Sequence, residues 1–150
     1  MRVVVQRVTE AAVSVNQCTT GQIGRGLLVL AGFEADDKAS DLDWMAQKLI
    51  KLRIFPDGEG VMNHSVLDVG GAILAVSQFT LYASTKKGNR PSWAGAASGV
   101  ISQPLFECFV EKMSVALGRA VATGVFGADM QVSLINDGPV TITMDSRNPE

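Results

Sequence analysis

The sequence predicts a mixed α+β fold of three layers, in which largely antiparallel or mixed β-sheets are combined with two main helices. The 150 residues are 47% hydrophobic and 19% charged, a composition that suits one globular core and a single domain over residues 1–150. Strand and helix patterns follow one another as strands, helix, strand, helix and strands, and strand residues outnumber helix residues. Two helices cannot cover both faces of so large a sheet, so a further layer of sheet or a second subunit is expected on one face.

The first part of the chain has the pattern of strands followed by a helix. Apolar residues, mostly valines, recur along residues 3–15, and a continuous apolar run follows at 26–33, as expected for strands. A helix is predicted over residues 40–53, where apolar residues recur at helical spacing and basic residues gather near the end. Ser40 lies three residues before Asp43, which resembles a capping box at the start of this helix.

The middle of the chain contains a turn at residues 56–60, a connection at 65–71 and a second continuous apolar run at 72–76. Such a run is typical of a strand that is buried on both faces. The strand is expected to continue through Ser77–Ala83, where small hydroxyl-bearing residues alternate with bulky ones, before a polar loop begins.

A second helix and further strands are predicted for the rest of the chain. The helix has Ser102 as its N-cap, Pro104 in its first turn, and Gly118 as the residue that ends it. The predicted strands cover residues 121–126, 130–135 and 140–144.

Charge and cysteine content narrow the class of protein. Thirteen Lys and Arg against fifteen Asp and Glu give a net charge of −2, which argues against a surface that binds nucleic acid everywhere but allows a local basic patch. Cys18 and Cys108 are far apart and form no CxxC pair, so reduced thiols in a cytoplasmic protein are expected. The apolar run at the N-terminus breaks after three residues, which is too short for a signal peptide, and no stretch approaches eighteen apolar residues, so no membrane partner is expected.

The sequence lacks the motifs of several cofactor- and metal-dependent enzymes. It contains no GxSxG, GxxxxGK[ST] or HExxH motif, and the glycines at positions 21, 24 and 26 do not match a dinucleotide-binding fingerprint. The single histidine, His64, lies in a polar stretch and is interpreted as a solvated loop residue. No cofactor and no metal are therefore expected, and any catalysis is expected to depend on few side chains.

The first candidate site is the segment Ser77–Tyr82, which carries two hydroxyl groups and one amide after the apolar run. Ser77 and Thr80 would face opposite sides of a regular strand. The hydroxyl groups either end the strand by bonding nearby backbone, or form a strand-end site in which Gln78 and Thr80 donate hydrogen bonds to a substrate. No base lies near either hydroxyl in the sequence, so an activated nucleophile would need one from elsewhere in the fold.

Three further features each have an ordinary and a functional interpretation. Asn136–Pro139 is most simply a hairpin turn between two strands, but a rigid Gly-Pro pair could expose two fixed carbonyl oxygens. The polar stretch 85–90 is most simply a solvated loop, but its cations could meet a phosphate backbone. The ring of Phe126, which has small neighbours, could stack on a base or be buried in the core.

The segments Ser77–Ala83 and Asn136–Thr141 resemble the two signature motifs of the D-aminoacyl-tRNA deacylases. The likeness extends in order through residues 2–8, 67–71, 88–91 and 126–132. This resemblance implies the fold of that family and hydrolysis of the ester between a D-amino acid and the 3′-terminal adenosine of a tRNA. Glycine mischarged on tRNA(Ala) is implied as a second substrate.

The resemblance also implies a homodimer. Gly138 and Pro139, joined by a cis peptide, would enter the active site of the other subunit as a chiral selector, and Arg7 would hold this loop in place. A D-residue bound by fixed carbonyls points its side chain outward, whereas the L-enantiomer drives its side chain into rigid backbone. Glycine has no side chain to repel, so it would be accepted.

The resemblance to the deacylases implies that catalysis takes place at the first motif, Ser77–Ala83. Backbone N–H groups near Phe79 and Thr80 are expected to hold the carbonyl oxygen, while Ser77 and Gln78 order the pocket and the ribose 2′-hydroxyl assists. Thr80 as a covalent nucleophile is the competing assignment.

The resemblance also implies that two other groups of residues bind the tRNA end. Phe126 and Met130 match the adenosine-binding segment of the family. The cations expected along the acceptor backbone are Lys86, Lys87 and Arg90. A catalytically inert RNA-binding module that keeps the pocket, and a general esterase without enantioselectivity, remain the alternatives.

Overall fold

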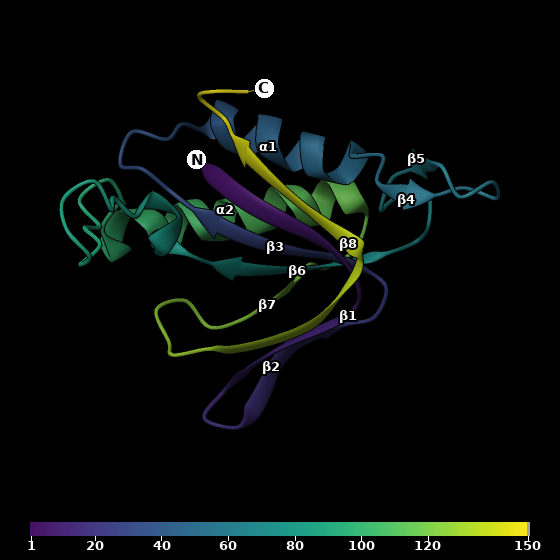
Figure 1. Ribbon diagram of the computed structural model, residues 1–150, viewed down its shortest axis with the longest axis horizontal. Coiled ribbons are helices and arrows are strands. Elements are labelled where there is room, and N and C mark those ends of the chain that lie inside the picture. The colour runs from purple at the N-terminus through teal and green to yellow at the C-terminus, as the bar shows by residue number, and fades with distance from the viewer. Residues whose placement is uncertain (150) are drawn as a thin grey trace.

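Two long strands, β1 (Arg2–Val15) and β8 (Gln131–Asp145), pair antiparallel through the protein (Figure 1). The structure is a computed structural model that describes residues 1–149. The other described strands are β2 (Cys18–Ile23), β3 (Gly26–Gly32), β4 (Phe55–Pro56), β5 (Met62–His64), β6 (Ala72–Ser77) and β7 (Ala122–Thr123). The described helices are α1 (Ala39–Lys51), α2 (Gly99–Leu117) and the short 3₁₀ helix η1 (Phe79–Tyr82).

The main sheet is mixed, as predicted. β1 pairs antiparallel with β2, β3 and β8, whereas β3 pairs parallel with β6, and β6 pairs parallel with β7. β4 and β5 form a separate antiparallel pair. The strands predicted within the first 33 residues and at 72–76 are confirmed.

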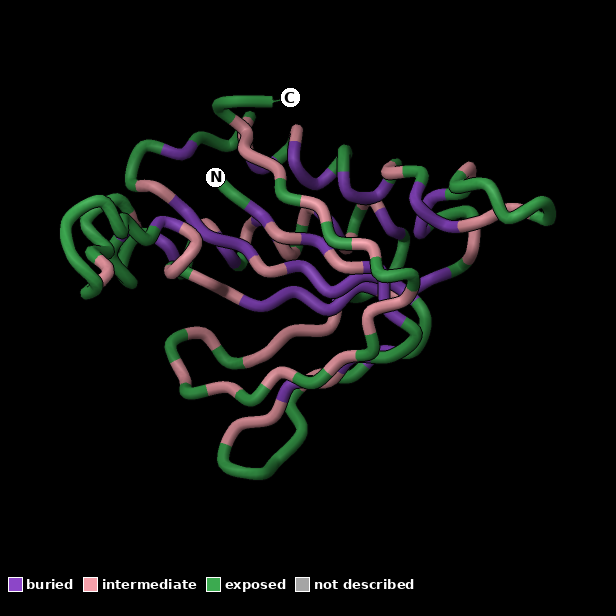
Figure 2. Tube along the Cα trace, viewed as in Figure 1, coloured by how far each residue is buried: buried purple, intermediate pink, exposed green. Residues whose placement is uncertain are grey.

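The three predicted layers are present because β1 passes from one layer into the next. Its first half pairs with β3 and its second half pairs with β2, while β8 follows it along both halves. Side chains of β3 alternate between the two sides of the sheet: Leu27 and Val29 belong to the core under the helices, whereas Leu28 packs with Leu74 and the second half of β1. Figure 2 shows β3 and β6 buried along most of their length between these layers.

Helix α1 lies close to its predicted position, but its start was predicted wrongly. The N-cap is Lys38, whose backbone N–H donates to Asp41 Oδ2 at 2.8 Å. The carboxylate that reaches back to the helix start therefore belongs to Asp41, not to the predicted pair of Ser40 and Asp43. The helix ends at Lys51, and its buried stripe consists of Leu42, Met45, Ala46, Leu49 and Ile50.

Helix α2 begins earlier than predicted, after an N-cap at Ser98. Ser102 is buried inside the helix, where its Oγ donates to the Ser98 carbonyl at 3.0 Å, so the predicted cap and the placement of Pro104 in the first turn are wrong. A hydroxyl satisfied by a carbonyl one turn earlier does not cap a helix. The predicted end at Gly118 is confirmed: this residue has a φ of +75° and its N–H bonds the last carbonyls.

The strand predicted through Ser77–Ala83 is wrong beyond Ser77. At this point β6 has reached the end of β3, and the backbone N–H of Gln78 donates to the Ala31 carbonyl at 2.7 Å. The chain then turns into η1, which packs against Gly32 at the end of β3. The predicted alternation of Ser77 and Thr80 across a strand therefore does not occur.

The hairpin predicted at Asn136–Pro139 is also wrong, because β8 continues through it. Asn136 lies opposite Val8 and Thr141 lies opposite Gln6, so β1 advances by two residues while β8 advances by five. The extra residues form a wide bulge inside a strand that is paired on both sides of it.

Two smaller predictions also need correction. Of the predicted strand 121–126, only Ala122–Thr123 pairs, next to Leu74 and Ala75 of β6. His64 is exposed, as predicted, but it lies on β5 and not in a loop. Among the described helices, none is long and apolar enough to cross a membrane.

Candidate active site

A cavity of about 470 Å³ opens at the carboxyl ends of the parallel strands β3 and β6. Its walls come from the two strand ends, the start of α2 and the segment that leads into β8. Strands that run parallel bring their carboxyl ends to one edge, which is where ligands bind in many mixed and parallel sheets. The position of the cavity therefore agrees with a strand-end site.

The cavity brings together two of the sequence segments that were singled out. Ser77, Gln78 and Phe79 line it from β6 and η1, and Phe126 and Met130 line it from the segment before β8. These residues lie about 50 positions apart in the chain and meet only through the fold.

The cavity has an unusual chemical character for an active site. Among the described residues that line it, none has a titratable side chain; the polar groups are backbone, the hydroxyls of Ser77 and Ser102, and the amide of Gln78. Within residues 1–149, moreover, no group of three or more His, Cys, Asp or Glu side chains lies close enough to hold a metal ion. General acid–base catalysis by a side chain in the cavity wall is therefore not available to this site.

Thr80 lies next to the cavity but is not part of its wall. Its Oγ1 accepts a hydrogen bond from the Gln78 side-chain amide. An amide N–H is a donor and not a base, so this contact orients the hydroxyl without activating it as a nucleophile. Phe79 and Thr80 are also the first two residues of η1, and the first N–H groups of a helix have no partner within it.

An aromatic pair connects the cavity wall to the neighbouring loop. Phe79 is 53% exposed and packs edge-to-face on Trp93, with the ring centres 5.4 Å apart. Trp93 follows the loop that Ser84 and Ser92 close by two backbone hydrogen bonds of 2.8 and 2.9 Å. This loop carries three exposed cations that do not line the cavity, namely Lys86, Lys87 and Arg90.

Phe126 combines both interpretations that the sequence left open. Its ring is partly buried, packs on Phe106 at a centre distance of 6.1 Å, and also lines the cavity. One part of the ring thus belongs to the core while another part faces the space that a ligand could occupy.

The bulge at Gly138–Pro139 is exposed, contains a cis peptide bond, and does not line the cavity. Arg7 contacts the bulge through Asp137. The Nε group of Arg7 donates to the Asp137 carbonyl at 3.2 Å and lies 3.0 Å from Asp137 Oδ2. The Nη1 group of Arg7 donates to the Ile54 carbonyl at 2.5 Å, and the residue is only 7% exposed. The buried guanidinium therefore ties the bulge to Ile54, the residue that precedes β4.

Within one chain the bulge and the cavity are separated. Arg7 lies opposite Leu27 on β3, whereas Ser77 lies opposite Ala31 at the other end of that strand. Four residues of strand correspond to roughly 13 Å. Gly138 and Pro139 therefore do not join the cavity of their own chain.

Comparison with known proteins decides the family. The family model described as D-Tyr-tRNA(Tyr) deacylase matches residues 4–145. The chain belongs to this family. Proteins named D-aminoacyl-tRNA deacylase from Dechloromonas aromatica (strain RCB) and Chromobacterium violaceum are 69% and 62% identical to it, in each case over 100% of both chains.

Solved structures share the fold. The structure of a c-Myc DNA Unwinding Element Binding Protein superposes with a TM-score of 0.91 at 39% identity, over 97% of this chain and 98% of that one. A structure described as a "probable eukaryotic D-amino acid tRNA deacylase" has a TM-score of 0.81 at 22% identity, over 95% and 97% of the two chains, and shows the fold alone. The resemblance, the mixed α+β fold and the class of enzyme, a hydrolase of ester bonds, are thus confirmed.

Sequence reasoning missed part of the cavity wall. Gly99 and Ser102 line the cavity from the start of α2. They were missed because the sequence around them contains no recognisable motif. A helix start can be inferred from capping residues, but its approach to a distant strand end cannot.

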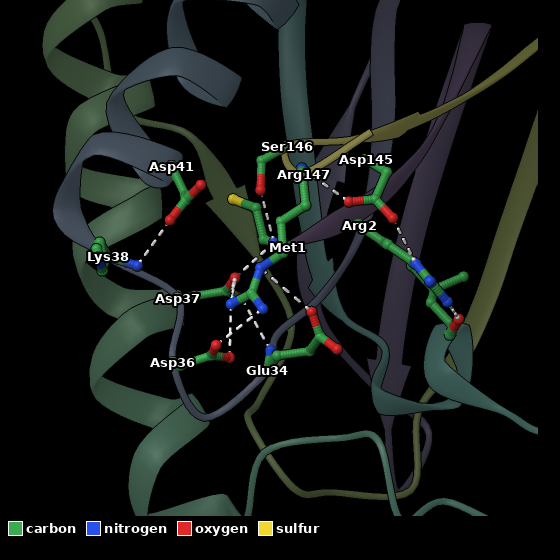
Figure 3. Close-up of polar contacts among 11 residues, drawn as sticks. Met1, Arg2, Glu34, Asp36, Asp37, Lys38, Asp41, Asp145, Ser146 and Arg147 are labelled. Carbon is green, nitrogen blue, oxygen red and sulfur yellow. Dashed lines mark hydrogen bonds and ion pairs between the residues drawn. The ribbon is translucent and has the colours of Figure 1, made fainter. Parts of the chain in front are cut away.

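A network of charged residues beside the end of η1 was also missed (Figure 3). Arg147 bonds Asp36 and Asp37, and Asp37 also accepts a hydrogen bond of 2.6 Å from the Met1 nitrogen. Arg2 bonds Asp145 at 2.9 Å across 143 residues of sequence. A separation of this size leaves no local pattern in the sequence from which the pair could be read.

Tyr82, the last residue of η1, lies against this network. Its hydroxyl is buried and has no hydrogen-bond partner among the described residues. Burial raises the pKa of Tyr82 far above its ordinary value, and the nearby carboxylates of Asp37 and Glu34 raise it further. The phenol therefore stays neutral and acts as a packing surface.

Proposed function

We propose that this protein hydrolyses the ester that joins a D-amino acid, or glycine, to the 3′-terminal adenosine of a tRNA. The observation that carries the proposal is a cavity that joins the first motif segment to Phe126 and Met130 and has no titratable side chain in its described wall. An aminoacyl ester beside a ribose 2′-hydroxyl brings part of its own chemistry, so positioning and charge stabilisation are what the protein must supply. Glycine mischarged on tRNA(Ala) is a second substrate, and the cytoplasm, where tRNA is charged, is the expected location.

The backbone N–H groups of Phe79 and Thr80 hold the ester carbonyl oxygen in this mechanism. Their place at the start of η1 leaves them without helical partners, beside the cavity wall. The loss of one such donor costs on the order of 3 kcal/mol of transition-state stabilisation. Ser77 and Gln78 order the pocket, and Gln78 holds the Thr80 hydroxyl.

Gly138 and Pro139 act as the chiral selector for the cavity of a second copy of the chain. Their distance from the cavity of their own chain favours a homodimer in which each copy completes the other's site. The carbonyl oxygens of the bulge bind the substrate's amino group, and an L-side chain collides with rigid backbone. Arg7 keeps the bulge in position through Asp137 and Ile54.

The tRNA end is bound by two groups of residues around the cavity. Phe126 and Met130 pack against the terminal adenine, since both line the cavity and Phe126 is supported from behind by Phe106. The acceptor backbone passes the loop beside Trp93, whose cations are Lys86, Lys87 and Arg90.

The test is release of amino acid from D-Tyr-tRNA and L-Tyr-tRNA in parallel, with and without a chelator. We expect rapid release from the D-ester, little release from the L-ester, and no effect of the chelator. Equal rates on the two esters contradict the selector and support a general esterase. Inhibition by the chelator contradicts a mechanism built from backbone and substrate groups.

A nucleic-acid-binding protein without hydrolysis is the second candidate, and the name of the structural relative that binds a DNA element favours it. Binding of D-Tyr-tRNA with no release of tyrosine supports this candidate. A single-stranded DNA competitor then shows whether binding depends on the aminoacylated RNA end.

A further inference from the structure

The η1 turn that carries Phe79 and Thr80 is short and depends on the rest of the fold for its orientation. Two of its bonds join Leu81 N–H to the Gln78 carbonyl at 3.3 Å and Ala83 N–H to the Thr80 carbonyl at 3.0 Å. A single 3₁₀ turn with such bonds has little stability of its own. Contacts from outside the turn must therefore fix the direction of its N–H groups.

One such contact is the end of β3. A Cβ atom on Gly32 would lie 2.8 Å from the Gln78 carbonyl oxygen and 3.3 Å from Leu81 Cβ and Tyr82 Cδ2. The turn thus occupies the space that a side chain at position 32 would fill. This contact supports the turn from the side of β3.

The second contact is the side chain of Arg2. Arg2 is the partner of Gly32 across β1 and β3, and opposite residues of an antiparallel pair face the same side of the sheet. Its Nη1 lies 3.4 Å from the Leu81 carbonyl oxygen, and its guanidinium carbon lies 4.6 Å from the centre of the Tyr82 ring. Arg2 therefore meets both the backbone and the buried last side chain of the turn.

Asp145 holds Arg2 in this position from the other neighbouring strand. Arg2 and Asp145 are register partners on β1 and β8, and Arg2 Nε donates to Asp145 Oδ2 at 2.9 Å. Asp145 Oδ1 accepts a hydrogen bond of 3.0 Å from the Arg147 backbone N–H. Burial alone would raise the pKa of Asp145, but these hydrogen bonds outweigh it and hold the pKa below its ordinary value, so the carboxylate stays charged.

We propose that Arg2, held by Asp145, is a positioning residue that fixes the turn carrying Phe79 and Thr80 so that their N–H groups face the ester carbonyl. The inference rests on the proposed function, which assigns those N–H groups to the carbonyl oxygen. An arginine is needed because its planar fork contacts Asp145, the Leu81 carbonyl and the Tyr82 ring at once, which a lysine ammonium does not. The side chain of Arg2 is 44% exposed, so its ion pair contributes little to overall stability and its effect is geometrical.

The test is Arg2→Lys, which keeps the positive charge and loses the fork. We expect kcat on D-Tyr-tRNA to fall between about tenfold and a hundredfold, as for a small misplacement of catalytic groups, with KM within about twofold. Asp145→Asn lowers kcat in the same sense. The matched control is Lys112→Gln, which removes an exposed ion pair between α2 and Asp43 of α1, and which leaves kcat and KM unchanged.

Amide hydrogen exchange supplies a readout that does not depend on substrate. In Arg2→Lys the amides of Leu81 and Ala83 exchange faster, while amides of β3 and β6 and the melting temperature stay as in the wild type. An unchanged kcat, unchanged exchange in the turn, or a loss of protection throughout the protein each overturns the inference. If the wild type itself releases no D-tyrosine, the proposed function fails and the inference fails with it; normal wild-type release with an unchanged variant overturns the inference alone.

Discussion

Replacement of Gly138 with alanine tests the proposed selector directly. The added Cβ would lie 2.8 Å from Arg7 Nη2 and 2.9 Å from Val140 Cγ2, and at the φ of +125° of this residue an alanine is strained by roughly 1–3 kcal/mol. To make room, Arg7 must give up hydrogen bonds to Asp137 and Ile54, and each such bond to a charged group contributes about 1.5–3 kcal/mol. Displacement of the exposed bulge costs less free energy than holding a strained alanine in place and breaking the hydrogen bonds of Arg7. We therefore expect the bulge to move and the rate of D-ester hydrolysis to fall by about 100-fold.

The same variant can show which copy of the chain supplies the bulge. Ala128→Trp, placed in the cavity wall, fills the substrate space and inactivates the cavity while the bulge stays intact. When the two inactive variants are mixed as equal parts and allowed to exchange subunits, half of the dimers contain one copy of each. In these dimers one of the two sites combines an intact cavity with an intact bulge, so about one quarter of wild-type kcat returns.

The assay is initial release of labelled D-tyrosine from D-Tyr-tRNA, and each variant mixed with itself is the control. If the bulge served the cavity of its own chain, every site in the mixture would carry one defect. A mixture no more active than its separate components therefore refutes the reasoning, even if Gly138→Ala alone is inactive.

Three other predictions follow from the site and its surroundings. Thr80→Ala retains most of the turnover in single-turnover release, because Thr80 lacks a base; a loss above about 1000-fold would restore it as the nucleophile. The three loop cations are Lys86, Lys87 and Arg90. Their substitution by Gln lowers the slope of log Kd against log salt concentration by about two to three, as measured by titration with tRNA at several salt concentrations. An unchanged slope contradicts contact between these cations and phosphate. Hydrogen bonds from the Asn63 side chain and from the Glu59 and Val61 backbone lower the pKa of Asp57 in the folded state. The ionised Asp57 therefore stabilises the fold above the unfolded-state pKa, which is near 4. This stabilisation is lost as the pH falls through the folded-state pKa. Urea titrations between roughly pH 2 and 6 should show a smaller acid-side loss of stability for Asp57→Asn than for the wild type, and equal losses contradict the assignment.

Regular parts of the fold could be predicted because their pattern is local. The apolar runs that became β3 and β6 and the helical spacing of Leu42, Met45 and Leu49 need no knowledge of distant residues. Gly118 ends α2 for an equally local reason, since glycine adopts its positive φ without strain. The starts of the two helices were harder to predict, because several polar residues near each start are suitable as N-caps.

The turn η1 and the bulge at Asn136–Pro139 could not be predicted, since distant contacts determine both of them. The alternation through Ser77–Ala83 has the period of a strand, but the space above Gly32 and the side chain of Arg2 favour a turn there. Asn136–Pro139 has the composition of a hairpin, but both of its flanks pair with β1 and turn it into a bulge. In each place a tertiary contact outweighed a local preference.

These two irregular points share β1 as a common frame. Arg2 at one end of β1 contacts the turn with the proposed carbonyl-binding groups, and Arg7, five residues further along, contacts the bulge. A strand paired on both edges, by β3 and β8, cannot stretch, so the roughly 16 Å between these positions is set by strand register. In a two-fold symmetric dimer the same spacing recurs in the second copy, so each bulge can meet the opposite cavity in one geometry only. Because the described cavity wall has no titratable side chain, the proposed mechanism relies on such fixed backbone groups, and the pairing of β1 provides the rigidity that this mechanism requires.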